Sequence, residues 1–189
     1  MRQLKKRTAL VSVILAACIL LAAGVGVTVA YLVSKSLTLD NTFTLGNVGI
    51  TLTESPTEGY MILPGAEIPK DPTVTVKGGS DACWLFFKAE ASSDFGSYMT
   101  YSVAEGWTPL EGELNVYYRS VEKTVGDLSF GIIRDNSVSV RETVTEEELE
   151  LIRKKPTLSF RAYAVQRAEI SSAEEAWDIL KEEQLNEAT

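Results

Sequence analysis

Apolar and polar residues alternate in short segments along most of the chain after residue 35, and Gly, Pro, Asn and Asp separate the segments. Alternation with a period of two is typical of strands that bury one face. Short strands at close spacing, joined by turn residues, indicate an all-β sandwich or jelly roll. The segments that we expect to be strands are 36–39, 42–45, 48–53, 71–77, 82–89, 98–103, 114–121, 128–133, 137–140 and 157–166.

Three of these segments allow a finer prediction. The alternation in 48–53 places Val48, Ile50 and Leu52 on one face. Residues 82–89 are almost continuously apolar, as in a central strand that is covered on both faces. In 157–166, one face carries Leu158, Phe160, Ala162 and Ala164. Residues 54–70 contain three prolines and should form a loop.

Two stretches have helical patterns instead. Thr145 followed by Glu148 is a capping box, which predicts that a short helix begins there. Ser172 opens a second helix, and its apolar stripe consists of Ala176, Trp177, Ile179 and Leu180. The charged tail, 182–189, should fray. We therefore expect one β-sandwich domain over 31–181, with one or two short helices at its periphery.

The first thirty residues have the three parts of a secretory signal peptide. Lys5, Lys6 and Arg7 precede an uncharged run over 8–34, and small residues at Thr28 and Ala30 suit cleavage before Tyr31. The run is also long enough for an uncleaved membrane anchor to about residue 34. A lipobox ending at Cys18 is a third alternative, although the apolar run continues beyond that cysteine. In every case the leader contacts a membrane, and we expect a protein that is secreted or held at the cell surface.

Charge separates the leader from the remainder. The leader holds four of the 18 Lys and Arg residues and none of the 26 Asp and Glu residues, so 14 cations and 26 anions give the remainder a net charge of −12. A field of this sign repels nucleic acid and favours solubility, so no nucleic-acid partner is expected. Cys83 is the only cysteine after the leader, which excludes an intramolecular disulfide, and its apolar neighbours predict a buried residue.

The chain contains no histidine. That excludes Ser-His-Asp and Cys-His catalysis and zinc sites built on histidine pairs. Catalysis by two carboxylates stays open, but we expect no enzyme activity, no catalytic or metal site and no cofactor. The acidic runs 146–148 and 182–183 are typical of a solvated helix face rather than a calcium loop. Trp107, in Gly106-Trp107-Thr108-Pro109, is the best candidate for an exposed sugar-binding ring.

Several segments together are similar to the TasA/camelysin family of Gram-positive bacteria, whose members carry SipW-dependent-type signal peptides. The resemblance covers both ends of the chain, whereas 92–155 is less diagnostic. It rests on the leader running into 30–32, then 41–48, 63–65 and 70–77, and on 160–166 followed by Ala173, Glu175, Ala176 and Trp177.

This resemblance implies a jelly-roll sandwich, export, cleavage by a dedicated signal peptidase, and a structural role in the fibres of a biofilm matrix. It also implies self-association, or association with related matrix proteins, by addition of the mature N-terminal segment as a strand to the next subunit. The candidate donor strand carries Tyr31, Val33, Leu37, Leu39, Phe43 and Leu45. Alternatively, this segment is the domain's own first strand, and the protein is a monomeric binding module, tethered or secreted. The metalloprotease label of some relatives does not carry over, because the histidine ligands are missing.

Overall fold

The computed structural model describes residues 42–56, 62–150, 152 and 155–187. Their regular secondary structure is mostly β-strand with a few helices, which confirms the all-β prediction, whereas the jelly-roll connectivity stays a prediction. Sheet A has the order β1 (Thr42–Leu45), β11 (Leu158–Gln166), β5 (Cys83–Ala91), β8 (Val116–Val121), β7 (Thr108–Pro109). Its strands are antiparallel to their neighbours except β1, which runs parallel to β11.

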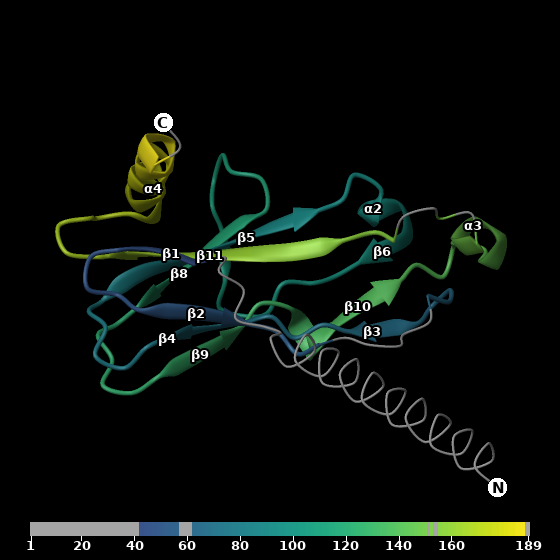
Figure 1. The fold of residues 1–189 in the computed structure, drawn as a ribbon, viewed down its shortest axis with the longest axis horizontal. Helices are drawn as coiled ribbons and strands as arrows, with labels where there is room; N and C mark the ends of the chain where they lie inside the picture. Colours follow the sequence, from purple (N-terminus) through teal and green to yellow (C-terminus); the bar gives the residue numbers. More distant parts are fainter. Residues whose placement is uncertain (1–41, 57–61, 151, 153–154, 188–189) are drawn as a thin grey trace, which may run out of the picture. The chain divides into compact units, whose positions relative to one another are not determined.

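Two three-stranded sheets form the opposite layer (Figure 1). Sheet B has the order β2 (Ile50–Thr53), β4 (Thr73–Val76), β9 (Leu128–Gly131). Sheet C has the order β3 (Glu67–Pro69), β10 (Ser137–Val140), β6 (Met99–Thr100). The helical segments are α2 (Phe95–Tyr98), the 3₁₀ turn η1 (Arg134–Asn136), α3 (Glu146–Glu150) and α4 (Ala173–Glu187).

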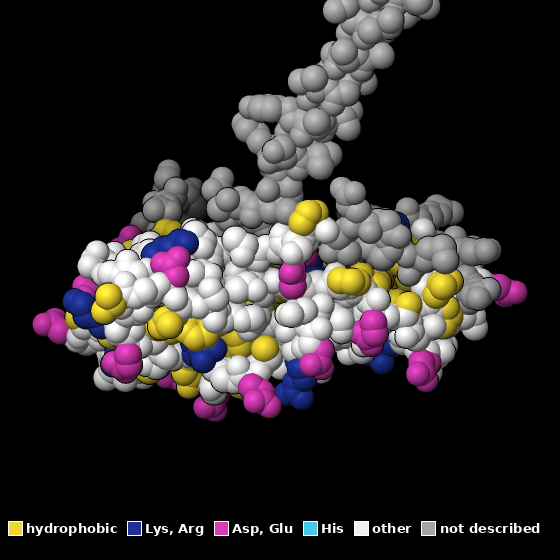
Figure 2. All heavy atoms as spheres, turned by 90° about the horizontal axis from the view of Figure 1, so that it is seen from below, with side chains coloured by type: hydrophobic (Ala, Val, Ile, Leu, Met, Phe, Trp, Pro, Cys, Tyr) yellow, Lys and Arg dark blue, Asp and Glu magenta, His cyan; other side chains and the backbone are white. Residues whose placement is uncertain are grey.

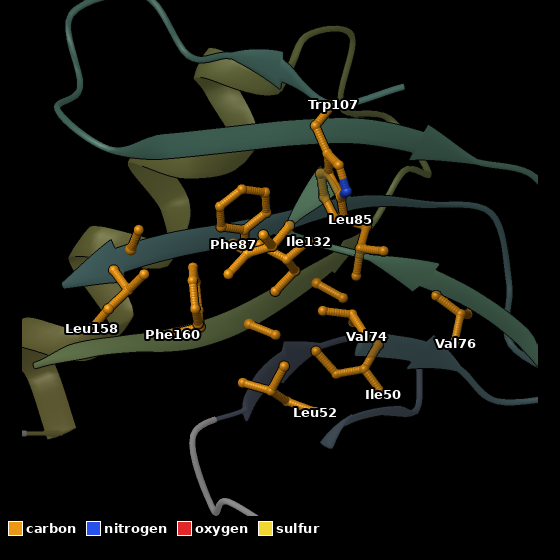
Figure 3. Packing of buried hydrophobic residues seen from close by; sticks show 14 of the residues in the cluster. Ile50, Leu52, Val74, Val76, Leu85, Phe87, Trp107, Ile132, Leu158 and Phe160 are labelled. Atoms are coloured by element: carbon orange, nitrogen blue, oxygen red, sulfur yellow. The ribbon is translucent and has the colours of Figure 1, made fainter. Parts of the chain in front are cut away.

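The main core lies between sheet A and the other two sheets, and Figure 3 shows part of it. Leu52, Val74 and Leu85 are completely buried there. Val48 and Ile50 join them, as the alternation in 48–53 predicts. On β11 the predicted face is also confirmed, because Leu158, Phe160, Ala162 and Ala164 all belong to this cluster.

The outer face of sheet A carries a second apolar cluster beneath α4. Phe86 from β5, Tyr163 from β11 and Trp177 from α4 are its largest buried members. The Trp177 ring lies 5.2 Å from each of the other two rings. β5 is therefore covered on both faces, as its continuous apolar run predicts.

The two predicted helix starts are confirmed at the level of hydrogen bonds. Thr145 N–H donates to Glu148 Oε2 at 2.9 Å, and Glu148 N–H donates to Thr145 Oγ1 at 3.2 Å, which completes the capping box. The N–H of Glu175 donates to Ser172 Oγ at 3.2 Å. α4 continues to Glu187, beyond the point where the charged tail was expected to fray.

Two parts of the strand prediction are wrong in detail. The expected loop 54–70 contains β3, and the expected strand 98–103 is divided between the end of α2 and β6. β3 has a proline at its last position and lies at the edge of sheet C, where the missing N–H is tolerated. None of the helices in the described ranges is long and apolar enough to cross a membrane.

Candidate strand-acceptor edge

Within the described residues, β11 is only partly covered on the side where β1 lies. β11 has nine residues, and the four residues of β1 pair with Ala162–Val165. Among the described residues, nothing pairs with 158–161 on that side. An uncovered stretch of strand presents main-chain N–H and C=O groups that can accept another strand. We call 158–161 the open edge of β11.

An apolar groove lies next to the open edge. Strands of both layers contribute Ile68, Met99, Val138 and Leu158, and the rest of the lining is Lys70, Phe95, Pro156 and Thr157. The groove encloses about 220 Å³. Sites for small molecules and cofactors usually measure about 300–1,000 Å³. The size of the groove therefore suits a few apolar side chains better than a cofactor.

Lys70 is the one charged residue among the described residues that line the groove, and its charge is already paired. Its Nζ lies 2.6 Å from Glu54 Oε1, and the two side chains are 18% and 16% exposed. The same Nζ lies 5.7 Å from the centre of the Phe160 ring. Because the cation is neutralised inside the domain, the groove offers an apolar surface rather than an anion site.

Only part of the candidate donor strand falls on the described residues. Phe43 and Leu45 belong to β1 and pack, partly buried, against the cluster under α4. At these two positions the segment is the domain's own edge strand. Tyr31, Val33, Leu37 and Leu39, and the cleavage residues Thr28, Ala30 and Tyr31, lie outside the described residues.

The prediction that Trp107 is an exposed sugar-binding ring is wrong. Its side chain is 8% exposed, its ring lies 4.8 Å from that of Phe87, and its Nε1 donates to Gly131 O at 2.8 Å. Trp107 therefore joins β9 to the segment before β7. Trp177 is buried as expected, and Trp84 is half-buried and donates to Ile170 O at 3.3 Å.

Two further candidates for chemistry are ordinary structural features. Cys83 is fully buried, as predicted, and burial raises the pKa of its thiol to about 11, so it is a poor nucleophile at neutral pH. A polar hollow of about 380 Å³ near the turn after β11 contains Asp81, Lys123 and Arg167. Lys123 Nζ lies 2.8 Å from Asp81 Oδ1 and lowers the pKa of that carboxyl, while Arg167 pairs with Glu122 at 2.8 Å.

Acidic side chains are abundant, but they are dispersed. Within the described ranges, no group of three or more Cys, Asp or Glu side chains is placed to hold a metal ion. On the face shown in Figure 2, carboxylates and basic side chains are interspersed, with hydrophobic side chains between them. The charge therefore has the distribution of a solvated surface.

The open edge and its groove were not visible in the sequence, because their residues come from β3, β6, β10 and β11. Comparison with protein-family models, with curated proteins and with solved structures finds no match to this chain.

Proposed function

We propose that the chain is an exported, non-enzymatic structural protein of the cell surface or biofilm matrix, similar to TasA, which self-associates by N-terminal strand addition. The open edge of β11 beside an apolar groove is the observation that carries this proposal. An incoming strand would form main-chain hydrogen bonds along the edge and bury alternate side chains in the groove.

The directions in which alternate side chains of the N-terminal segment would point favour an incoming strand from another copy. Phe43 and Leu45 point to the outer face of sheet A. If the same chain continued β1 backwards in register, Leu37 and Leu39 would share that face, and the polar Thr38 and Asp40 would point toward the groove. A strand from another copy is free to bind with a register that is shifted by one residue, which turns the leucines inward.

The estimated free energy of strand addition predicts that assembly depends on protein concentration. Burying two leucines contributes about 3–6 kcal/mol, and a few main-chain hydrogen bonds add about 0.5–1.5 kcal/mol each. Association costs roughly 4–15 kcal/mol in lost freedom of motion. Because the two totals are similar, the contact between two copies should be weak. Its strength should depend on how well the incoming side chains fit the groove.

A second candidate is a secreted or membrane-tethered binding module that stays monomeric. The observation that favours it is β1 itself, which already pairs with β11 of its own chain. In that case 31–41 would be a linker between the membrane and the domain. The two candidates differ in whether 31–39 is needed for association.

Size-exclusion chromatography and electron microscopy of 31–189 and 40–189 separate them. We expect oligomers or filaments only from the longer chain. Thr157→Lys places a charge on the exposed lining of the groove and should weaken assembly, whereas Ala168→Lys, exposed in the turn at the other end of β11, should not. Monomers in both chains at high concentration would contradict self-association. N-terminal sequencing of the protein from culture supernatant tests export and cleavage before Tyr31.

A further inference from the structure

Arg119 is an arginine whose charge has no partner within the described part of the chain. It lies on β8, and its Cζ is 3.9 Å from the centre of the Phe130 ring and 5.3 Å from that of Trp107. Its Nε is buried and has no hydrogen-bond partner among the described residues. The described residues contribute no hydrogen bond or ion pair to its Nη groups either. We call Arg119, Trp107 and Phe130 the arginine slot.

The slot holds the guanidinium in one place. The main chain comes close at Gly106, whose φ is +83°, and a Cβ at that position would lie 3.0 Å from Nη2. The backbone conformation therefore favours glycine, and a Cβ there would require the end of the Arg119 side chain to shift slightly. Aromatic stacking stabilises the cation but leaves its in-plane N–H donors unused. Burial lowers the pKa of Arg119, although the group stays protonated at neutral pH.

The slot opens at a free strand edge. β9 is the last strand of sheet B. Within the described ranges, the main chain on its outer side is hydrogen-bonded only from Gly131 onward. There Trp107 Nε1 donates to Gly131 O, and Ala104 N–H donates to Ile132 O. Leu128 shares the inward face with Phe130 and is 41% exposed. Leu128 thus lies two residues from Phe130 along the open edge of β9, and the guanidinium of Arg119, which comes from β8, lies over the Phe130 ring.

We propose that the arginine slot binds a carboxylate carried by an extended acidic peptide segment, which lies along the edge of β9 at Leu128–Phe130. Its acidic side chain meets the guanidinium fork, and its side chain two residues away covers Leu128. Arginine pairs with carboxylate through two parallel N–H···O bonds, and the fixed fork limits the ordering that binding requires. This proposal is independent of strand addition at β11.

A peptide fits the slot better than an acidic sugar does. Trp107 uses its ring against Phe87 and Arg119 and is only 8% exposed, so it offers no face for a sugar ring. The edge of β9, in contrast, offers main-chain groups that pair with another backbone. The net negative charge of the domain is screened over about 8 Å at physiological ionic strength. The positive charge of Arg119 therefore dominates the electrostatic interaction with a carboxylate at the slot.

The test is a titration followed by NMR, which reports on the Nε–H of Arg119 in the chain from Tyr31, a chain that retains the compact unit 37–189. The probes are acetyl-Thr-Val-Thr-Asp-Thr-amide and the same peptide with Asn in place of Asp, at 150 mM salt. We expect the Asp peptide to shift the Arg119 resonance and to bind about tenfold more tightly, which corresponds to one charge-assisted hydrogen bond.

Two variants separate the slot from general charge effects. Arg119→Gln should lose the preference for the Asp peptide, whereas Arg161→Gln, which removes an exposed arginine paired with Glu90 on the other face of sheet A, should keep it. Equal binding of both peptides by the unaltered protein would overturn the proposal, and this arm does not depend on whether Arg119→Gln folds. A shift of the Arg119 resonance by an oligogalacturonate, without one by the Asp peptide, would also overturn it.

Discussion

Replacing Trp177 should separate the contribution of the indole ring from that of its N–H group. Trp177 is 5% exposed and contacts Phe86 and Tyr163 across the interface between α4 and sheet A. Its Nε1 is buried, and the part of the chain that the structure describes offers it no hydrogen-bond acceptor. The ring therefore stabilises the interface. The N–H group destabilises it, because it loses its hydrogen bonds to water and gains none from the described residues.

The two effects have different sizes. Trp→Ala changes in a core cost about 3–5 kcal/mol. Removing an unsatisfied buried donor returns about 1–3 kcal/mol. Taking the middles of the two ranges, we expect Trp177→Ala to lower the free energy of unfolding by about 2 kcal/mol. Trp177→Phe keeps most of the ring contact and removes the N–H, so it should stay within about 1 kcal/mol of the unaltered protein.

Guanidinium denaturation followed by circular dichroism measures both variants. With a slope of about 4 kcal/mol per molar for a domain of this size, Trp177→Ala should lower the midpoint by about 0.5 M. Leu114→Ala, at a position that is 86% exposed, is the control and should leave it unchanged. If the Phe variant were as damaging as the Ala variant, the N–H would have a partner and the reasoning would fail. If both were neutral, α4 would not be packed on sheet A.

Three further predictions concern titration and capping. Burial raises the pKa of Cys83 to about 11, so the folded state holds the thiol proton more tightly than the unfolded state. The free energy of unfolding should therefore be unaffected by this group below about pH 8.5 and should fall as the pH rises toward 11. Cys83→Ala should flatten this alkaline slope in unfolding curves measured from pH 8 to 11. Hydrogen bonds from the hydroxyl and the N–H of Ser55 lower the pKa of Asp71, so that stabilisation is present above the ordinary pKa and is lost as the pH falls through the lowered one. Ser55→Ala should therefore move the midpoint of acid unfolding to higher pH, and an unchanged midpoint would contradict this. Thr145→Ala should destabilise α3 by about 1 kcal/mol, seen as faster amide exchange in that helix, while Thr145→Ser should not.

The sequence predicted the elements that depend on local pattern. Alternation located β2, β4, β10 and β11, and the continuous apolar run located β5, because each pattern reflects burial on one face or on two. The capping box located α3 for the same local reason, since donor and acceptor are three residues apart.

Trp107, the pairing of β1, the groove and the arginine slot were missed because they depend on residues that are distant in the chain. Trp107 follows a glycine in a turn, which suggests exposure, yet Phe87 and Gly131 bury it from two other strands. The parallel pairing of β1 with β11 joins residues about 120 positions apart, and nothing local indicates it. The groove and the arginine slot have the same origin, because each combines side chains from separate sheets.

Disulfide trapping tests most directly whether the N-terminal segment adds to another copy. In the chain from Tyr31, Thr38→Cys and Ser159→Cys place one thiol on the donor segment and one on the open edge. Both thiols face the outer side of sheet A when the leucines of the incoming strand point inward, and the native Cys83 stays buried. Mixing the two single variants under mild oxidation should give a cross-linked dimer, and the double variant should give a ladder of linked chains. Cross-links confined within single chains of the double variant, with no dimer from the mixture, would show that each domain covers its own edge and would contradict the account.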